Sequence, residues 1–357
     1  HSEFPHSFKL IHKRRLTFWT PFYELHMNKR VLIVSTGGTI LSSGDSPIQL
    51  TNYTCRGTTI KDVLGNADWA EDINLDCREI FTIPSSRITY KHWKKLIEFL
   101  NEEIRQEDVM GAVVAHGTDT LEESAFFANL FLKTDKPVVF TGAMRPNTAL
   151  GSDGALNLFN SVQIVLNSTS EKRGVLICLN GKISEARLTT KAHTLEPGAF
   201  QVPEYGFCGF VINVTVEFVS RCEKPHTTQT QFNISDLSGK ETLPFVPIIF
   251  AYADEGAELI RASIHCGAKG IVYAGTGHGS ISLEAENALN EASAKGVIVV
   301  RASRINGPVL PSKERWSKAG FIPAGTLNSI KARLLMAIAL ASVGNDRMEI
   351  ERIFQTY

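Results

Sequence analysis

The chain has 357 residues, of which 43% are hydrophobic and 21% charged, a composition typical of a folded globular protein. This length favours two domains or one large domain, and a chain of this size buries a core without disulfides. Lys plus Arg and Asp plus Glu both total 37, so the zero formal net charge does not favour a nucleic acid or an anionic membrane as a partner. No apolar run approaches the roughly 20 residues that span a bilayer. The cysteines and histidines lack the spacings of a metal site, so we predict no metal and no cofactor.

The first 26 residues differ from the rest of the chain. The segment contains basic residues, and its apolar stretch is short, is broken by a proline and lacks a small-residue cleavage site, so it makes a poor secretory signal. Because Met27 resembles a natural start, we interpret residues 1–26 as a vector-derived or upstream extension. We expect a cytoplasmic protein, or a periplasmic one if a native leader was replaced.

From Met27 onward, short apolar runs alternate with segments of helical periodicity. The runs lack the period-two alternation of half-exposed strands, which is typical of strands buried on both faces. They occupy residues 31–34, 112–115, 137–140 and 174–179. Residues 89–104 carry apolar side chains at the spacing of one helix face, and Ser152-Asp153 is a plausible N-cap of a second helix. This alternation predicts a parallel sheet flanked by helices and joined by right-handed crossovers.

Residues 221–244 interrupt the alternation, since they are polar with proline near both ends, and we interpret them as an interdomain linker. The pattern then resumes. Strands are predicted at 247–252, 270–275 and 296–300, and helices from Asp254, from Ser282, over 327–342 and near Phe354. We therefore predict two α/β domains. The larger N-terminal domain, residues 27–220, has a mainly parallel sheet flanked by helices, and the smaller C-terminal domain, residues 245–357, is parallel α/β.

The first strand ends in Ser35-Thr36-Gly37-Gly38-Thr39, which suits a phosphate-binding loop, a nucleophile turn or an ordinary tight turn. A phosphate loop needs GxxxxGK[ST] or GxGxxG, and this segment has neither pattern and no following lysine. The GxGxG at residues 274–280 is a weak signal, because a glycine turn after a strand is common. Nucleotide binding is therefore disfavoured, while the nucleophile and the ordinary turn both remain open.

Ligands bind outside the carboxyl ends of the strands in open parallel sheets, so the residues just after each strand are the candidates for a site. Thr118 and Asp119 come after one strand, and Lys191 lies in a polar stretch after another. A threonine hydroxyl attacks only when a base takes its proton, and glycine N–H groups can form an oxyanion hole. With Thr39, this set suffices for acyl transfer. Taken singly, Thr39 and Asp119 could equally cap helices, and Lys191 could be a solvated charge.

Three segments together resemble the bacterial-type L-asparaginases, the asparaginase/glutaminase family. They are STGGTI at 35–40, AHGTDTLEESAFF at 115–127 and TGAMRPNTALGSDGALNLFNSV at 141–162. The similarity runs in order from Lys29 to Tyr357 and is closest to type II, although TTKAH and PSSRIT are similar to type I. It implies hydrolysis of L-asparagine to L-aspartate and ammonia. The alternatives are a dual glutaminase-asparaginase, a subunit of a tRNA amidotransferase, or a catalytically silent amino-acid-binding protein.

The resemblance also implies roles for individual residues. Thr39 corresponds to the nucleophile, and Tyr53 to a tyrosine that hydrogen-bonds it from a mobile lid of about residues 40–56. The family's second threonine and its Asp–Lys pair correspond to Thr118, Asp119 and Lys191. Backbone N–H near Gly38, together with Thr118, would hold the oxyanion.

Substrate binding and assembly are implied by the same resemblance. Ser85 corresponds to the serine that holds the α-carboxylate, and Asp119 would receive the α-ammonium. The family implies a homotetramer in which a neighbouring subunit completes each site, and Glu314 is the best match for that neighbour's glutamate. Ser86 stands where type II has glutamine, and His278 where the family often has Asn or Ser. Both positions lie near the substrate in the family, so they bear on the choice between L-asparagine and L-glutamine.

Overall fold

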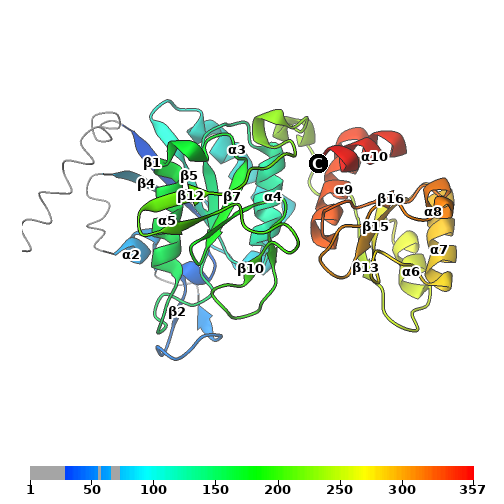
Figure 1. Cartoon of the computed structure of the whole chain (residues 1–357), viewed down its shortest axis with the longest axis horizontal. Coiled ribbons are helices and arrows are strands. Elements are labelled where there is room, and N and C mark those ends of the chain that lie inside the picture. Colours follow the sequence, from blue (N-terminus) through cyan, green and yellow to red (C-terminus); the bar gives the residue numbers. More distant parts are fainter. Residues whose placement is uncertain (1–28, 55–57, 66–72) are drawn as a thin grey trace, which may run out of the picture.

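The computed structural model describes residues 29–54, 58–65 and 73–357, which form two α/β units lying side by side (Figure 1). The predicted extension at residues 1–26 lies outside the described residues, as do residues 55 and 56 of the predicted lid. The larger unit contains a sheet of eight strands, and the smaller one a sheet of four. This arrangement confirms the predicted fold class.

The large sheet has the strand order β12-β11-β8-β7-β6-β5-β1-β4. Five strands pair in parallel, namely β1 (Arg30–Ser35), β4 (Asn74–Glu79), β5 (Val109–Ala115), β6 (Val138–Thr141) and β7 (Val175–Leu179). The other three extend the sheet antiparallel, namely β8 (Lys182–Glu185), β11 (Gly209–Ile212) and β12 (Thr215–Phe218). Two short pairs lie outside it, β2 (Ser43–Gly44) with β3 (Tyr53–Thr54), and β9 (Thr190–Lys191) with β10 (Phe200–Gln201).

Helices cover both faces of the large sheet, which explains its uniformly apolar strands. The helices are α2 (Ile60–Leu64), α3 (Tyr90–Ile104), α4 (Leu121–Phe131) and α5 (Gly154–Leu166). Along β1, Val31 and Ile33 pack in the cluster beneath α2 and α5, while Leu32 and Val34 pack in the cluster beneath α3 and α4. Asp153 occupies the N-cap position of α5, as predicted. Its carboxylate, however, accepts hydrogen bonds from the N–H groups of Met144 and Arg145, both at 3.0 Å.

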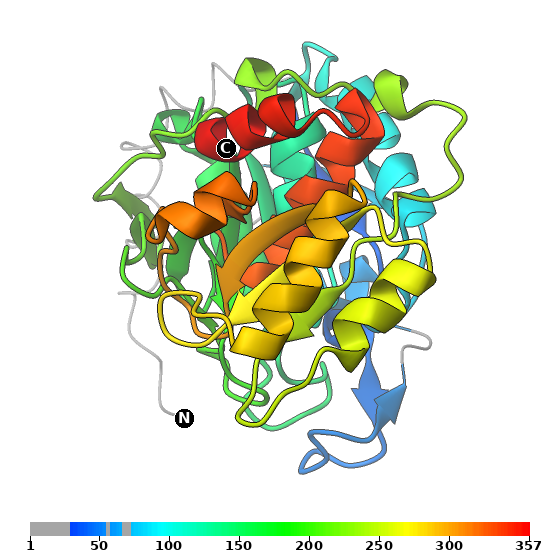
Figure 2. The same ribbon diagram turned by 90° about the vertical axis from the view of Figure 1, so that its right-hand side faces the viewer.

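The small sheet is entirely parallel, with strands β13 (Ile248–Phe250), β14 (Gly270–Gly275), β15 (Ile298–Ser303) and β16 (Ile322–Pro323). Its helices are α6 (Glu258–His265), α7 (Leu283–Ala294), α8 (Glu314–Lys318), α9 (Ser329–Val343) and α10 (Arg347–Thr356). Figure 2 shows α6 and α7 on the outer face of this sheet and α9 behind it, toward the larger unit. The predicted start of α6 at Asp254 is wrong by four residues, because Asp254 has a φ of 61° and cannot begin a right-handed helix.

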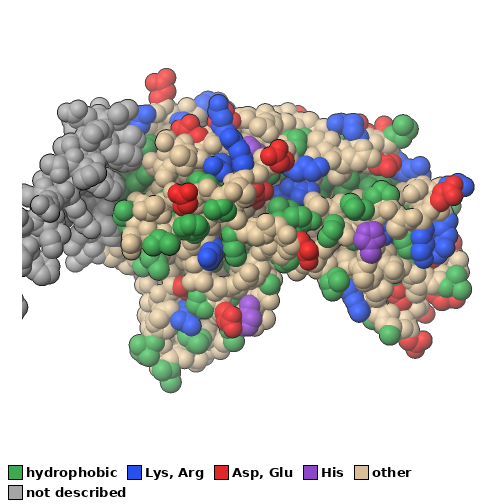
Figure 3. Space-filling model, viewed as in Figure 1, with side chains coloured by type: hydrophobic (Ala, Val, Ile, Leu, Met, Phe, Trp, Pro, Cys, Tyr) green, Lys and Arg blue, Asp and Glu red, His purple; other side chains and the backbone are tan. Residues whose placement is uncertain are grey.

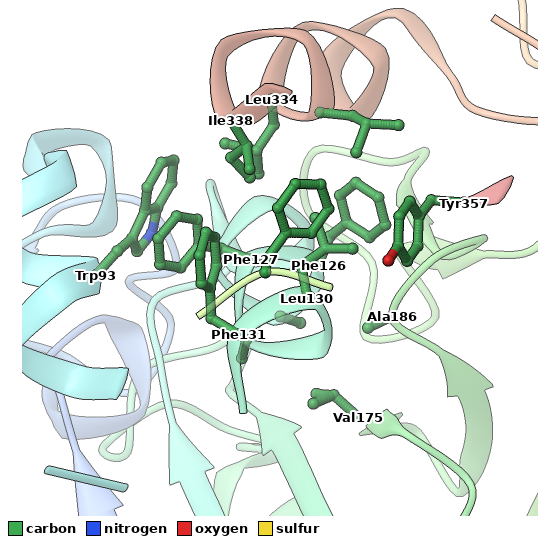
Figure 4. Close-up of a cluster of buried hydrophobic side chains, with 14 of the residues drawn as sticks. Trp93, Phe126, Phe127, Leu130, Phe131, Val175, Ala186, Leu334, Ile338 and Tyr357 are labelled. Atoms are coloured by element: carbon green, nitrogen blue, oxygen red, sulfur yellow. The ribbon is translucent and has the colours of Figure 1, made fainter. Parts of the chain in front are cut away.

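One apolar cluster joins the two units. It includes Phe126 and Phe127 of α4 together with Leu334 and Ile338 of α9 (Figure 4). Every residue of α4 except Glu123 is buried, because the helix packs on the large sheet on one side and on α9 on the other. A helix that is apolar nearly all round requires such an environment.

The segment 221–244, predicted as a linker, packs against both units. It contains the 3-10 helices η5 (Thr227–Gln229) and η6 (Ile234–Leu237), and two further 3-10 turns of the chain are η3 (Ser85–Arg87) and η4 (Ser168–Ser170). Phe232 and Leu237 are buried, and the Lys133 ammonium donates to the carbonyls of Thr227 and Thr230. The segment is therefore polar in composition but anchored by a few buried side chains.

The face of the described residues drawn in Figure 3 shows no concentration of one charge. Acidic and basic side chains are interspersed on the face drawn in Figure 3, in keeping with the zero net charge. Within the described ranges, no helix is both long and apolar enough to cross a membrane.

Replacing Phe232 by Ala should destabilise the protein strongly. Its ring is 2% exposed and lies 5.8 Å from the Phe131 ring and 5.2 Å from the Tyr357 ring, centroid to centroid. Loss of such a buried ring should lower the free energy of unfolding by about 3–5 kcal/mol, measured by urea denaturation. Phe245→Ala is the matched control, since Phe245 is 48% exposed. Equal effects of the two substitutions would contradict the anchoring of segment 221–244.

Candidate active site

The loops after β1 and β5 touch through their backbones. Gly37 and Gly38 have φ of 101° and 90°, values that favour glycine. A Cβ on Gly37 would lie 2.5 Å from the carbonyl oxygen of Ile83, and one on Gly38 would overlap the Cα of Gly117. Backbone packing therefore requires glycine at both positions. The backbone N–H groups of these two glycines also lie next to Thr39 in the chain.

Thr39 is presented directly after these glycines. It begins the 3-10 helix η1 (Thr39–Leu41), whose N-cap is Gly38, so Thr39 does not act as a helix cap. Its side chain is mostly buried, and its Oγ1 lies 2.9 Å from the Tyr53 hydroxyl. Tyr53 comes from the β2–β3 hairpin in the predicted lid. Gly44 of this hairpin donates its N–H to Thr148 Oγ1 at 2.9 Å, which ties the lid to the loop after β6.

A second constellation lies at the end of β5. The Lys191 ammonium donates to Thr118 Oγ1 at 3.0 Å and to Asp119 Oδ1 at 2.8 Å. The Thr118 residue is 5% exposed and the Lys191 side chain 17%, whereas the Asp119 side chain is 65% exposed. Lys191 is thus not a solvated charge. Asp119 is not a helix cap either, because the N-cap of α4 is Thr120.

Ser85 connects this constellation to the η3 turn. Its buried Oγ accepts the N–H of Asp119 at 3.1 Å, and its carbonyl accepts the Thr120 hydroxyl at 2.8 Å. As an acceptor from Asp119, the Ser85 hydroxyl keeps its own proton for another acceptor, such as a carboxylate. The neighbouring Ser86 is exposed.

His116 supports the same loop through a hydrogen bond to its backbone. It is fully buried, and its Nδ1 donates to the carbonyl of Gly117 at 2.7 Å. Burial lowers the pKa of His116 to about 4, so the ring is neutral at neutral pH. With Nδ1 protonated, Nε2 carries a lone pair, and it has no hydrogen-bond partner among the described residues.

The structure does not gather every predicted site residue in one place. His278 lies in the loop after β14 of the smaller unit, where its Nε2 accepts the N–H of Leu310 at 3.0 Å. Glu314 begins α8 and pairs with Lys318 at 2.8 Å. Both contacts stay within the smaller unit, away from the strand ends that carry Thr39.

One buried acidic residue near the site was not predicted. Glu122 is 4% exposed, and its Oε1 accepts the backbone N–H of Lys191 at 3.0 Å. The sequence signal, two glutamates in the first turn of a largely apolar helix, does not distinguish Glu122 from Glu123. Within the described residues, no group of three or more His, Cys, Asp or Glu side chains is arranged to hold a metal ion.

The comparisons with known proteins agree with this architecture. The family described as "Asparaginase, N-terminal" matches residues 30–224, and "Glutaminase/Asparaginase C-terminal domain" matches residues 245–354. L-asparaginase 2 of Bacillus subtilis is 37% identical over 92% of this chain and 86% of its own length. A glutaminase-asparaginase of Acinetobacter glutaminasificans is 35% identical over 92% of this chain and 99% of its own. The crystal structure of a probable cytoplasmic L-asparaginase from Campylobacter jejuni has a TM-score of 0.87 and 36% identity, covering 92% of this chain and all of that one. The chain therefore belongs to the asparaginase family.

His116 predicts a specific dependence of stability on pH. Its pKa is about 4 in the folded protein and 6.5 when unperturbed, so between these values the unfolded chain binds the proton more readily. The stabilisation is therefore complete above pH 6.5 and is lost as the pH falls toward 4, by about 3 kcal/mol in all. In His116→Asn, whose amide can donate to Gly117 but does not titrate, this part of the pH dependence should disappear. Urea denaturation at several pH values measures it, and identical slopes for both proteins would refute the assignment.

Proposed function

We propose that this protein hydrolyses the side-chain amide of L-asparagine to L-aspartate and ammonia, with Thr39 as the nucleophile. The observation that carries the proposal is the presence of two threonines at adjacent strand ends, one beside a phenol and one held by a Lys–Asp pair. Thr39 contacts Tyr53, and Thr118 contacts Lys191. The names of the family relatives support the same substrate.

In the proposed first half-reaction, Thr39 Oγ1 attacks the amide carbonyl carbon. Tyr53, at 2.9 Å, is placed to relay a proton, because its oxygen can accept the Thr39 proton while its own phenol proton moves to the departing nitrogen. The carbonyl oxygen becomes an oxyanion, for which the N–H groups near Gly38 and the Thr118 hydroxyl are donors. The C–N bond then breaks, ammonia leaves, and an ester remains on Thr39.

In the second half-reaction, water attacks this ester near Thr118 and Lys191. One water proton returns to Thr39 Oγ1 as the ester bond breaks, and aspartate is released. Lys191 orients the Thr118 oxygen through its 3.0 Å hydrogen bond. The Ser85 hydroxyl would hold the α-carboxylate, and the exposed Asp119 carboxylate would pair with the α-ammonium.

L-Glutamine is the second candidate substrate. Its support is specific, because relatives named glutaminase-asparaginase are 34–35% identical to this chain over 92% of its length. Ser86 and His278, which depart from the family pattern, are the positions we assign to this choice. A catalytically silent binding protein is less well supported, since such a protein has no need of both threonines.

We further propose a homotetramer in which a neighbouring copy supplies Glu314 and His278 to each site. The Glu314 side chain is 81% exposed and therefore accessible to a second chain. The proposed domains are residues 27–220 and 245–357, with the segment 221–244 between them. For the compartment we propose the cytoplasm, named for the Campylobacter jejuni protein, although a relative from Haemophilus influenzae is named periplasmic.

Thr39→Ala should lower kcat for L-asparagine by at least about 1,000-fold, because the attacking oxygen is removed. Ammonia release over a range of L-asparagine and L-glutamine concentrations measures this. Thr36→Ala is the matched control in the same loop, since the Thr36 hydroxyl donates to the carbonyl of Ala115 at 3.2 Å. Full turnover by Thr39→Ala would overturn the assignment of the nucleophile.

Mixing two inactive variants tests the shared site. Thr39→Ala and Glu314→Ala should each be nearly inactive alone. Equal co-expression should restore about a quarter of the wild-type activity, because that share of sites pairs an intact Thr39 with an intact neighbouring Glu314. The specific activity of the purified mixed oligomer is the measurement. No recovery in a mixed oligomer would show that both residues act within one chain.

A further inference from the structure

We propose that Glu122, held by Lys331 and Asn328 of the smaller unit, is a positioning residue that fixes Lys191 against Thr118. The inference rests on the role proposed for Lys191 in the hydrolysis. It assigns a part in the reaction to three residues that do not touch the substrate, and it makes helix α9 a support of the site on the large sheet.

The first contact is with the backbone of Lys191 itself. One oxygen of Glu122, Oε1, accepts the N–H of Lys191 at 3.0 Å and the hydroxyl of Thr190 at 3.2 Å. These two residues make up the short strand β9. The carboxylate therefore holds the main chain from which the Lys191 side chain extends.

The other oxygen of Glu122 is held by the start of α9. Its Oε2 lies 3.1 Å from Asn328 Nδ2 and 3.3 Å from Lys331 Nζ. Lys331 is fully buried, and its ammonium also donates to the carbonyl of Thr189. Asn328 is the N-cap of α9, where its Oδ1 accepts the N–H of Lys331 at 2.9 Å. The smaller unit thus binds both the Glu122 carboxylate and the backbone of Thr189, which precedes β9.

Glu122 also lies close in sequence to the loop that carries the candidate catalytic residues. Glu122 lies in the first turn of α4, and the loop just before that helix carries Thr118 and Asp119. One carboxylate therefore fixes β9 relative to the loop that Lys191 must reach. The Lys191 hydrogen bonds to Thr118 and Asp119 are 3.0 and 2.8 Å, so a shift of β9 by about 1 Å would break both.

The competing explanation is that the ion pair between Glu122 and Lys331 only joins the two units. Burial lowers the pKa of Lys331, and the charge of Glu122 opposes that change. Replacing a buried ion pair with apolar side chains is often neutral or stabilising, so stability alone does not account for the pair. Two double variants separate the explanations, since both remove the charges but only one keeps an acceptor for the Lys191 N–H.

The test compares Glu122→Met/Lys331→Met with Glu122→Gln/Lys331→Met in the full-length protein. The Met/Met protein lacks the acceptor, so kcat for L-asparagine should fall on the order of 10- to 100-fold, with KM changed less than about threefold. The Gln/Met protein keeps an amide oxygen for the Lys191 N–H and should recover kcat to within about threefold of wild type. Equal kcat values in the two folded double variants would overturn the proposal.

A third variant decides the matter if the Met/Met protein does not fold. Glu122→Asp keeps the charge but withdraws the carboxylate by one methylene, so kcat should fall about tenfold or more. A kcat within twofold of wild type would overturn the positioning role. Asp76→Asn is the matched control, because Asp76 is paired with Arg30 at the opposite end of β1. It should leave kcat unchanged.

Thr39→Ala, assayed in parallel, keeps the two proposals distinguishable. Loss of turnover in Thr39→Ala with wild-type kcat in the Glu122 variants would refute the positioning role alone. Full turnover in Thr39→Ala would refute the proposed nucleophile, whatever the Glu122 variants do.

Discussion

The site depends on the direct contact between the backbone turns after β1 and β5. A Cβ on Gly38 would overlap the Cα of Gly117, and a Cβ on Gly117 would clash with the side chain of Ser85. This contact brings the ends of two neighbouring parallel strands together, and each turn presents a buried threonine immediately afterwards, Thr39 in one and Thr118 in the other. A Cβ on Gly38 would push the two turns apart, so the glycine at this position sets the spacing of the two hydroxyls. The phenol of Tyr53 and the ammonium of Lys191 then each approach one of these threonines.

Much of this architecture is readable from the sequence because it is local. The uniformly apolar strands predict a sheet covered on both faces, and β1 shows why, since its successive side chains enter different cores. The rule that ligands bind at the carboxyl ends of parallel strands leads to the turns of Thr39 and Thr118. Family resemblance then distinguishes Thr39 from Thr36 and singles out Tyr53. In the structure Thr39 and Thr118 follow the adjacent strands β1 and β5, and their catalytic roles are predictions.

Other features escape the sequence because of distance along the chain and side-chain direction. The contact between Glu122 and Asn328 spans 206 residues, and no periodicity of α4 or α9 indicates it. The predicted start of α6 is wrong because the left-handed backbone of Asp254 excludes that residue from a right-handed helix, a conformation that the sequence pattern does not reveal. The polar composition of segment 221–244 predicts an interdomain linker, but it does not show that two buried side chains, Phe232 and Leu237, pack this segment into the cluster shared by the two units. The side chains of His278 and Glu314 contact Leu310 and Lys318 of the smaller unit, and their place in a site shared between copies is our proposal.

The same reasoning explains why the two units are not independent. Helix α4 buries nearly its whole circumference, so it cannot be exposed on the side toward α9 without leaving large aromatic side chains such as Phe126 in water. At the end of that apolar contact, a charged pair would be costly unless each charge were fully hydrogen-bonded. Glu122 satisfies both oxygens, and Lys331 donates to a carbonyl as well as to the carboxylate. Because one of those hydrogen bonds comes from the N–H of Lys191, the interaction that joins the units also reaches the residue that we propose orients Thr118. A two-domain chain can in this way place a buried polar network, here Glu122 with Lys331 and Asn328, where it can support a candidate site that is open to solvent.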